Sequence, residues 1–351
     1  MTSVQKSSTI VFKPSIEKRS TRAYIDTGKF CNYNCEFCYY KDQLDIRDDL
    51  EVVLTRIKRA YDYGMQSIEF CGGESTAEPN WFNFLTYAVE CGFKSISVVT
   101  NGSLLAKPEF ISRSQEIGLT EVLFSLHGSN SEQHDKIVGR NGSFKRILKA
   151  IQNAKKLNIT VRLNCTVTDL NYKSLQNEYS DIIKEINPLE VNFIAVKYNL
   201  DNTEFREIQY SEIVESIKLS IDNIKDYVKY INVRFVPFCL MQGYELYNVN
   251  HYQQIYDVYD WNRGTYKENY CGVNVSEEQQ TKNDFNAAAQ FRIDGYHKNE
   301  SCRECKNFYI CDGIDNKLKG QELIPIPGKK ILDPNHYRKD FYADVNFNLN
   351  S

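Results

Sequence analysis

The chain lacks both a long apolar run and an excess of either charge. Its 351 residues include 43 Lys and Arg against 46 Asp and Glu, a net charge of −3, and the mean hydropathy is −0.51. No segment approaches the ~20 apolar residues of a membrane span, and Met1–Ser20 has no apolar core of a secretory signal. Balanced charge provides no general field for attracting nucleic acid or an anionic membrane surface. We therefore expect a cytoplasmic protein that binds neither nucleic acid nor a membrane.

Internal repeats and low-complexity segments are also absent, and short strands alternate with helices from Thr21 to Val236. Such alternation is typical of βαβ units that build a parallel sheet. Six units are too few for a closed eight-fold barrel, so we expect an α/β fold, a partial (β/α)6 TIM-like barrel. The predicted strands are Ala23–Thr27, Ser67–Cys71, Ser95–Thr100, Val122–Leu126, Thr160–Val167 and Val191–Val196, and the predicted helices are Asp49–Tyr63, Trp81–Cys91, Pro108–Ile117, Ser143–Leu157, Lys173–Ile186 and Ser211–Tyr230.

Cysteine is the residue type that needs an explanation, because the chain has 11. An odd number in a chain without a secretory signal indicates a reducing compartment. Clustered thiols there serve metal or redox chemistry more often than disulfides.

The first cluster, Cys31, Cys35 and Cys38, has the spacing C-x3-C-x2-C. A structural zinc and a fully ligated [4Fe–4S] cluster each need four protein ligands. Three thiolates indicate a cluster with one iron left open, and half of a zinc site completed from afar is the alternative. The cysteines follow the first strand, at the carboxyl edge where active sites lie in such barrels.

Three more short motifs end the next strands. They are Cys71-Gly72-Gly73-Glu74, Thr100-Asn101-Gly102 and Ser125-Leu126-His127. Glycines let the backbone approach a ligand closely, and the Glu74 carboxylate can accept a hydrogen bond from a ligand ammonium group. Each motif alone is weak, but their order and their positions at strand ends reinforce one another.

These four motifs resemble those of the radical S-adenosylmethionine (SAM) superfamily, over about residues 21–236. The resemblance implies a [4Fe–4S] cluster on the three cysteines, with the aromatic Phe37 before the last of them. It implies that SAM binds the open iron and is contacted by the GGE-like residues Gly72, Gly73 and Glu74 and the TNG-like residues Thr100 and Asn101.

Alternation along the fifth predicted strand places Arg162, Asn164 and Thr166 on one face and Cys165 on the other. The polar face is expected to line the barrel lumen because helices cover the apolar one. Asn164 is therefore a candidate contact for SAM or substrate, and Cys165 a core residue. On the fourth strand, Ser125 and His127 share a face. His127 is a candidate SAM ligand or acid/base, with a structural histidine as the alternative.

A second cluster, Cys271, Cys302, Cys305 and Cys311, ends in the spacing C-x2-C-x5-C. It resembles part of the SPASM signature, although Asp315 stands where that pattern has a further cysteine. One auxiliary [4Fe–4S] cluster, as in the shortened twitch form, is the most that five cysteines after residue 236 can ligate. A hairpin at Phe291–Tyr296 fits this layout, and structural zinc is the competitor. We expect residues 1–20 to be an extension, 21–236 the barrel, 237–323 the auxiliary domain and 324–351 a tail wrapped over the surface.

Cys239 lies outside both spacings and allows three interpretations. It replaces Cys271 as a ligand, it is simply buried, or it donates hydrogen to a substrate radical and makes the enzyme an epimerase.

The resemblance implies reductive SAM cleavage and hydrogen abstraction from a C–H bond, with a flavodoxin or ferredoxin as electron donor. For the substrate we expect a small polar molecule, similar to a sugar or aminocyclitol, that is oxidised or epimerised. About 20 residues before the first strand are too few for a fused peptide-recognition domain. The aromatic and acidic stretch Tyr244–Trp261 suits such a substrate, with a tyrosine-rich packing layer between domains as the alternative. Modification of a ribosomal peptide is the alternative. A zinc-stapled binding module does not explain the ordered motifs.

Overall fold

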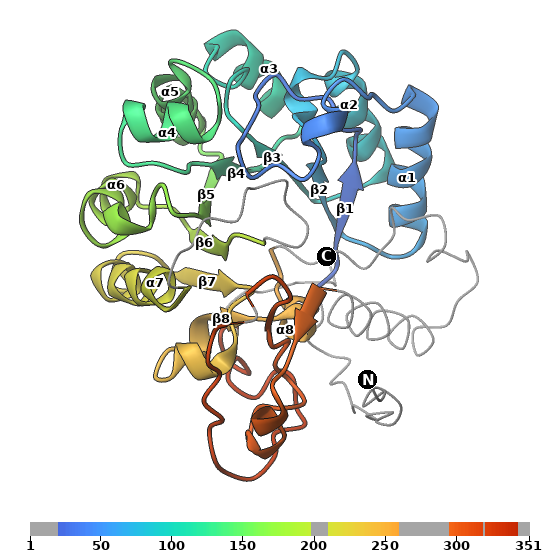
Figure 1. The fold of residues 1–351 in the computed structure, drawn as a ribbon. Helices are drawn as coiled ribbons and strands as arrows, with labels where there is room; N and C mark the ends of the chain where they lie inside the picture. The colour runs from blue at the N-terminus through green and yellow to red at the C-terminus, as the bar shows by residue number, and fades with distance from the viewer. Residues whose placement is uncertain (1–19, 198–209, 260–294, 319, 343–351) are drawn as a thin grey trace.

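A computed structural model describes residues 20–197, 210–259, 295–318 and 320–342. In these residues, eight parallel strands form one curled sheet whose spatial order follows the chain (Figure 1). The strands are β1 (Arg22–Asp26), β2 (Ser67–Cys71), β3 (Ser95–Thr100), β4 (Glu121–Ser125), β5 (Thr160–Val167), β6 (Glu190–Ala195), β7 (Tyr230–Arg234) and β8 (Asn248–Val249). The α/β partial barrel is therefore confirmed.

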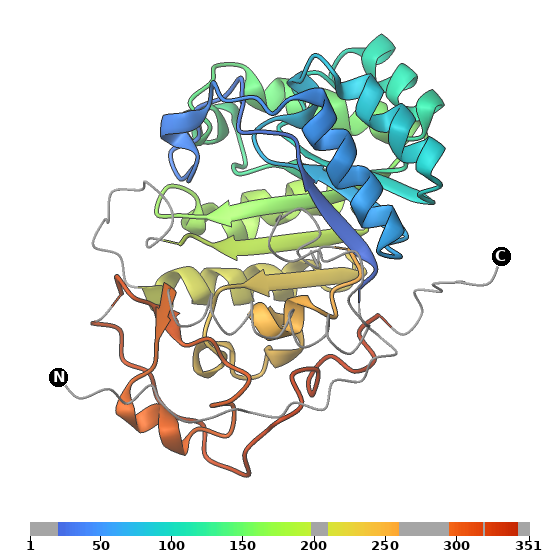
Figure 2. The ribbon, with the colours of Figure 1, turned by 90° about the vertical axis from the view of Figure 1, so that its right-hand side faces the viewer.

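Helices cover the outer, apolar face of the sheet (Figures 1 and 2). They are α1 (Leu50–Asp62), α2 (Trp81–Cys91), α3 (Pro108–Ile117), α4 (Ser131–Ile137), α5 (Ser143–Lys156), α6 (Ser180–Ile186) and α7 (Tyr210–Ile224), whereas the short α8 (His251–Gln254) follows β8 and contacts the C-terminal segment. Their apolar stripes pack with the outward strand residues into one large core, which includes Val161, Leu163 and the fully buried Cys165. The predicted orientation of β5 is therefore confirmed.

The sheet has two strands more than the six units that the sequence indicated. The predicted helix Ser211–Tyr230 ran into the first residue of β7, and residues 231–234 were assigned to no element; in the structure α7 stops at Ile224 and the strand starts at Tyr230. Its inward residues, Asn232 and Arg234, are polar and buried, so its sequence lacks the apolar run of a typical buried strand. Residue 248 of β8 lies beyond the boundary predicted at residue 236 and still pairs with β7.

Residues 295–342 lie on the β7–β8 side of the sheet (Figures 1 and 2). Within them, β9 (Tyr296–His297) pairs antiparallel with β10 (Ile314–Asp315). Asp315 therefore belongs to a strand, and its carboxylate accepts a hydrogen bond from the Lys317 N–H at 2.8 Å. The predicted hairpin at Phe291–Tyr296 falls mostly outside the described residues, as does Cys271.

A network of buried charges fills the lower part of the lumen. Arg22 of β1 pairs with Glu121 of β4 at 2.8 Å, and Arg162 of β5 pairs with Glu69 of β2. These side chains come from strands far apart in the sheet, so they meet inside the curl. The predicted inward orientation of Arg162 is confirmed. The network closes the amino-terminal end of the barrel and leaves the carboxyl edge as the place for a site.

The C-terminal segment reaches into the lumen as well, which corrects the expected surface wrap. Arg338 is buried and donates to the Asn232 side-chain carbonyl at 2.7 Å and to the Leu246 carbonyl at 2.7 Å. Tyr342 donates to Asp257 at 2.9 Å. The segment thereby covers the open side of the curled sheet at β7.

Candidate active site

The loop after β1 carries the first three cysteines at the carboxyl edge of the sheet. Cys31, Cys35 and Cys38 are free thiols and close enough to act on one another electrostatically. Burial, reinforced by Glu74, raises the pKa of Cys31 to about 12. A thiolate here therefore needs a positive partner, which cluster iron supplies. A hydrogen bond to this sulfur is already present, because the Tyr33 N–H donates to Cys31 Sγ at 3.4 Å.

The two glycines of the GGE-like turn are required by the close approach of this loop. A Cβ at Gly72 would lie 2.2 Å from the Gly28 carbonyl oxygen, and one at Gly73 would lie 2.0 Å from the Phe30 carbonyl oxygen. The backbone bonds Gly73 N to Gly28 O at 2.9 Å and Glu74 N to Phe30 O at 2.6 Å join turn and loop. The end of β2 therefore holds the segment that leads into Cys31.

Glu74 joins this turn to the end of β3. Its Oε1 accepts from the hydroxyls of Thr76 at 2.5 Å and Thr100 at 2.6 Å, and its Oε2 accepts from the Asn101 N–H at 2.6 Å. The carboxylate is almost fully buried, and that burial raises its pKa against the effect of these bonds. Among the described residues, Oε2 accepts only the Asn101 bond, so a lone pair is left for a ligand donor such as an ammonium group.

Asn101 connects the TNG-like turn to the cysteine loop. Its Nδ2 donates to the Asn32 side-chain oxygen at 2.8 Å and lies 3.9 Å from Cys31 Sγ. Its own side-chain oxygen accepts from the Ser103 N–H at 2.9 Å, and Ser103 in turn accepts from Asn32. The predicted residues of β2, β3 and the loop therefore lie together.

His127 is buried beyond the end of β4, and its ring lies edge-on to Phe37 with centroids 4.8 Å apart. Its Nδ1 accepts from the Thr166 N–H at 3.0 Å, which ties β4 to β5. Burial, with the neighbouring His134, lowers the pKa of His127 well below its usual value. The ring is thus neutral, with its proton on Nε2, and Nδ1 is occupied.

A row of polar residues crosses the inner face of the sheet at one level. The register aligns Ser125 with Asn164, Asn164 with Asn192, and Asn192 with Asn232. Ser125 and Asn164 are half-buried, whereas Asn192 and Asn232 are fully buried and bonded to each other at 3.0 Å. The two accessible members, Ser125 and Asn164, lie nearest the motif-bearing strands.

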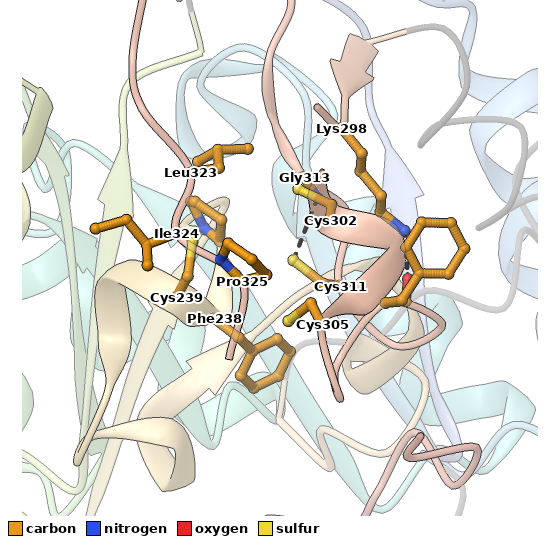
Figure 3. A pocket seen from close by; sticks show the side chains of 12 residues that line it. Phe238, Cys239, Lys298, Cys302, Cys305, Cys311, Gly313, Leu323, Ile324 and Pro325 are labelled. Carbon is orange, nitrogen blue, oxygen red and sulfur yellow. Dashed lines mark hydrogen bonds between the residues drawn. The ribbon is translucent and has the colours of Figure 1, made fainter. Parts of the chain in front are cut away.

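A second group of thiols surrounds one pocket beside the end of β7. Cys239 from the turn Phe238–Met241 lines it together with Cys302, Cys305 and Cys311 (Figure 3). None of these four forms a disulfide, and the last three act electrostatically on Cys239, whose pKa burial raises to about 12. The remaining walls are mainly apolar and include Phe238, Leu323 and Pro325. The structure therefore brings Cys239 to the predicted auxiliary cysteines, while Cys271 lies outside the described residues.

This pocket also contains donors aimed at sulfur. The Gly313 N–H donates to Cys311 Sγ and the Ile326 N–H to Cys305 Sγ, each at 3.4 Å. The Lys298 side chain lines the pocket and donates to the Phe308 carbonyl. Backbone N–H bonds and a nearby cation are the features that stabilise cluster thiolates.

By their chemistry the four thiols suit either an iron–sulfur cluster or a zinc ion. The mainly apolar walls and the backbone N–H groups that donate to Cys305 and Cys311 suit a cluster.

The expected substrate surface at Tyr244–Trp261 does not form as predicted in its described part. Asp257 is fully buried and pairs with Arg234 at 2.7 Å, and Tyr244 donates to Asp222 at 2.5 Å. These side chains therefore bond to other parts of the chain and do not form a substrate-binding surface.

None of the described helices is long and apolar enough to cross a membrane.

Sequence reasoning missed Thr76, Asn32 and Lys298. Thr76 was detectable, because Glu74 precedes a short helical turn and caps it through the Thr76 N–H. Asn32 and Lys298 flank cysteines in the chain, but only the folded loops show that their side chains face the sites.

An open parallel α/β barrel with three thiols at its carboxyl edge is the arrangement expected of proteins that bind a cluster through cysteines. Comparison with known proteins indicates the same class. Residues 25–186 match the profile of the Radical SAM superfamily. The chain therefore carries a radical SAM domain, and this family implies a [4Fe–4S] cluster and SAM as cofactors.

Curated relatives match about half of this chain. The AdoMet-dependent heme synthase of Methanosarcina barkeri is 27% identical over 44% of this chain and 45% of its own length. The Bacillus subtilis protein AlbA, of antilisterial bacteriocin subtilosin biosynthesis, is 27% identical over 57% of this chain and 46% of its own length. The chain thus spans about half the length of these two relatives.

Solved structures confirm the fold over a longer range. The structure of anSMEcpe with bound AdoMet and a peptide superposes with a TM-score of 0.56, at 17% identity, over 92% of this chain and 96% of that one. Streptococcus suis SuiB superposes with a TM-score of 0.52, at 17% identity, over 75% of this chain and 55% of that one. SuiB has also been solved with its precursor peptide SuiA.

Proposed function

We propose that the chain is an enzyme that cleaves SAM reductively and removes hydrogen from a C–H bond of its substrate. The proposal assigns the first cluster to Cys31, Cys35 and Cys38, and one auxiliary [4Fe–4S] cluster to Cys239, Cys302, Cys305 and Cys311. The observation that carries it is that one fold holds two separate sets of cysteines, three at the barrel edge and four around the pocket.

When bound, the first cluster supplies the electron that splits SAM into methionine and a 5′-deoxyadenosyl radical, which abstracts the substrate hydrogen. The chain's own residues bind SAM and the substrate and orient them. Glu74 Oε2 has an accepting lone pair for the SAM ammonium, and Thr100 and Asn101 hold that carboxylate in place. We assign Ser125, His127 and Asn164 to SAM or substrate; Ser125 and Asn164 are half-buried, whereas His127 is buried and packs against Phe37.

The assignment of Cys239 as an auxiliary ligand replaces the interpretation in which Cys271 is the fourth. It also disfavours Cys239 as a hydrogen donor, because a thiolate bound to iron has no S–H to give.

For the substrate we propose a peptide. This reading is supported by two structural neighbours that hold peptides, anSMEcpe and SuiB, and by the subtilosin biosynthesis protein among the relatives. The match to anSMEcpe covers 96% of that chain.

A small polar substrate, oxidised or epimerised, is the second candidate. The half-buried Ser125 and Asn164, side by side on β4 and β5, favour it, because hydroxyl-rich molecules need hydroxyl and amide partners.

The first experiment is anaerobic reconstitution with iron and sulfide, reduction with dithionite, and assay for 5′-deoxyadenosine. We expect about eight irons per chain, as two cubanes require, and SAM cleavage that disappears when Cys31, Cys35 and Cys38 are replaced by Ala. Reconstituted protein with a full iron content and no SAM cleavage would contradict the proposal.

Single variants then assign the auxiliary ligands. Cys239→Ala is expected to lose about half of the iron, whereas Cys271→Ala and the control Cys91→Ala keep it. Zinc in place of iron, with no visible absorption, would overturn the auxiliary cluster. A Cys239→Ala enzyme with intact iron that no longer makes epimerised product would instead establish the hydrogen-donor role.

The substrate class is decided by incubation in D2O with candidate peptides and with polyols. Mass loss in a peptide supports the first candidate. Deuterium incorporation into an unaltered polyol skeleton supports epimerisation of a small molecule.

A further inference from the structure

The cysteine loop of the first cluster lies against a strongly basic segment. The Asn34 N–H donates to the Val138 carbonyl at 3.2 Å, and the Glu36 N–H donates to the Ile137 carbonyl at 2.9 Å. Gly139 approaches so closely that a Cβ there would lie 2.5 Å from the Asn34 carbonyl oxygen. The turn between α4 and α5 is therefore the immediate neighbour of the backbone on both sides of Cys35.

This segment has the opposite charge to the rest of the chain. Residues 131–149 contain five cations and two acids, a local net charge of +3, in a chain of net charge −3. Lys136, Arg140, Lys145 and Lys149 are exposed, and Arg146 is half-buried. We call these five residues the basic patch.

The charges of the basic patch are not neutralised by acids. Arg146 donates to the Tyr33 hydroxyl at 3.2 Å and to the Asn141 carbonyl at 2.8 Å, and neither acceptor is a carboxylate. Asp135, the nearest acid in the chain, is occupied by the Ser143 hydroxyl and the Phe144 N–H. In the described part of the chain, none of the five cations forms an ion pair.

The charges of the basic patch also act electrostatically on the cysteine loop. Tyr33 stands two residues after Cys31 and two before Cys35, and its phenol is affected by both Arg146 and Arg140. A partner seated on the patch is thereby held against the loop that carries the cluster ligands.

We infer that the basic patch is the docking surface for the protein that reduces the first cluster, an acidic one-electron carrier of the flavodoxin type. This inference rests on the proposed function, because it requires a cluster on Cys31, Cys35 and Cys38. Charge complementarity selects the occupant: exposed, unpaired cations steer an anionic partner and hold it in register, and electron transfer requires that the two redox centres approach closely. A nucleic acid would also be attracted by these charges, and the test separates the two.

The experiment uses the full reconstituted chain and compares two reductants. Reduced flavodoxin must dock, whereas dithionite diffuses to the cluster without a binding surface. The variant is Lys136→Glu/Arg140→Glu. Its matched control is Arg59→Glu/Lys156→Glu, which changes the net charge equally on the exposed ends of α1 and α5.

We expect flavodoxin to reduce the patch variant about tenfold or more slowly than the native chain at low salt, with dithionite-driven 5′-deoxyadenosine formation unchanged. The control variant should behave like the native chain. For the native chain, the flavodoxin rate should fall as salt rises from 10 mM to 300 mM, because the screening length shortens from ~30 Å to below 10 Å.

Equal flavodoxin rates in the native chain and the patch variant would overturn the inference. A native rate that does not depend on salt would overturn it even if the variant folds poorly. Flavodoxin reduction that is unimpaired by a saturating excess of DNA or RNA supports the carrier as occupant, and tight binding of nucleic acid that blocks reduction counts against it. Failure of the proposed function is distinguishable, because it abolishes SAM cleavage with dithionite as well.

Discussion

The Glu74 carboxylate accepts a hydrogen bond from the Thr100 hydroxyl at 2.6 Å, which joins the end of β2 to the end of β3. Two motifs that stand 26 residues apart in the chain thus form one unit. The same carboxylate accepts the Asn101 N–H, and Asn101 reaches the cysteine loop through Asn32. The cofactor motifs therefore support one another before any ligand binds.

Glu74→Gln should weaken both the fold and SAM binding. The amide replaces one acceptor by a donor, so either the Thr100 hydroxyl or the Asn101 N–H loses its partner in a buried place, at a cost of about 1–3 kcal/mol. Calorimetry should show weaker SAM binding, and urea unfolding should show the stability loss. The exposed Glu116→Gln on α3 serves as the control. Native affinity in Glu74→Gln would show that the carboxylate is only a spectator.

Gly73→Ala should prevent loading of the first cluster. Its Cβ would lie 2.0 Å from the Phe30 carbonyl oxygen, and a backbone atom cannot move aside without displacing the loop that leads to Cys31. We expect about half of the iron to be lost, with the auxiliary cluster retained. Gly320→Ala is the matched control, because its Cβ would meet nothing within 4 Å. Full iron content in Gly73→Ala would contradict this account of the turn.

Glu121→Gln should lower stability near neutral pH but much less in acid. Burial acts to raise the pKa of the Glu121 carboxyl, but Arg22 and Arg162 outweigh it and hold the pKa at about 2. The ionised group therefore stabilises the fold above its ordinary pKa of 4.5, by about 3 kcal/mol, and this contribution is lost as the pH falls toward 2. Urea unfolding of the cluster-free chain should show a difference in the free energy of unfolding between native and variant, and this gap should shrink from pH 6 to pH 3. A constant gap would be inconsistent with the shifted pKa.

Glu190→Gln should show the opposite pH dependence. Burial and the nearby Asp257 raise the pKa of Glu190 to about 7, although Arg162 acts against them. One of its oxygens has no partner among the described residues. The fold favours the protonated form of Glu190. The contribution of this group to the free energy of unfolding is therefore fully present below pH 4.5 and is lost as the pH rises through 7. The variant should therefore gain stability relative to the native chain between pH 5 and pH 8. The same urea series measures this, and a gap that does not change over this range would contradict it.

Lys298→Gln should lower the reduction potential of the auxiliary cluster. The ammonium group lines the pocket and favours the thiolate forms of Cys302 and Cys311. Removing one positive charge destabilises the reduced, more negative cluster, on the order of 50 mV at an effective dielectric constant near 20. A redox titration followed by electron paramagnetic resonance measures the shift. Lys317→Gln, an exposed lysine of the same segment, is the control, and equal potentials in the two variants would refute the prediction.

Much of the fold was predictable because short apolar strands alternate with helical patterns along the chain, which indicates the six strands from β1 to β6. The inward face of β5 followed from the alternation of polar and apolar residues within that strand. The strand β7 was missed, since Asn232 and Arg234 are buried polar residues whose partners, Asp257 and Arg338, come from distant segments. The cysteine motifs predicted the first site because its ligands lie within eight residues.

The sequence by itself determined the α/β class, the carboxyl-edge position of the motifs and the three thiols beside Phe37, since each depends on spacing within one loop or strand. Only the tertiary structure decided that Cys239 meets Cys302, Cys305 and Cys311. These thiols lie on two segments that are far apart in the chain, and spacing carries no information about which distant segments fold onto each other. The same reason explains why the segment near Arg338 enters the lumen rather than wrapping the surface. It also explains why the basic turn between α4 and α5 lies beside the cysteine loop.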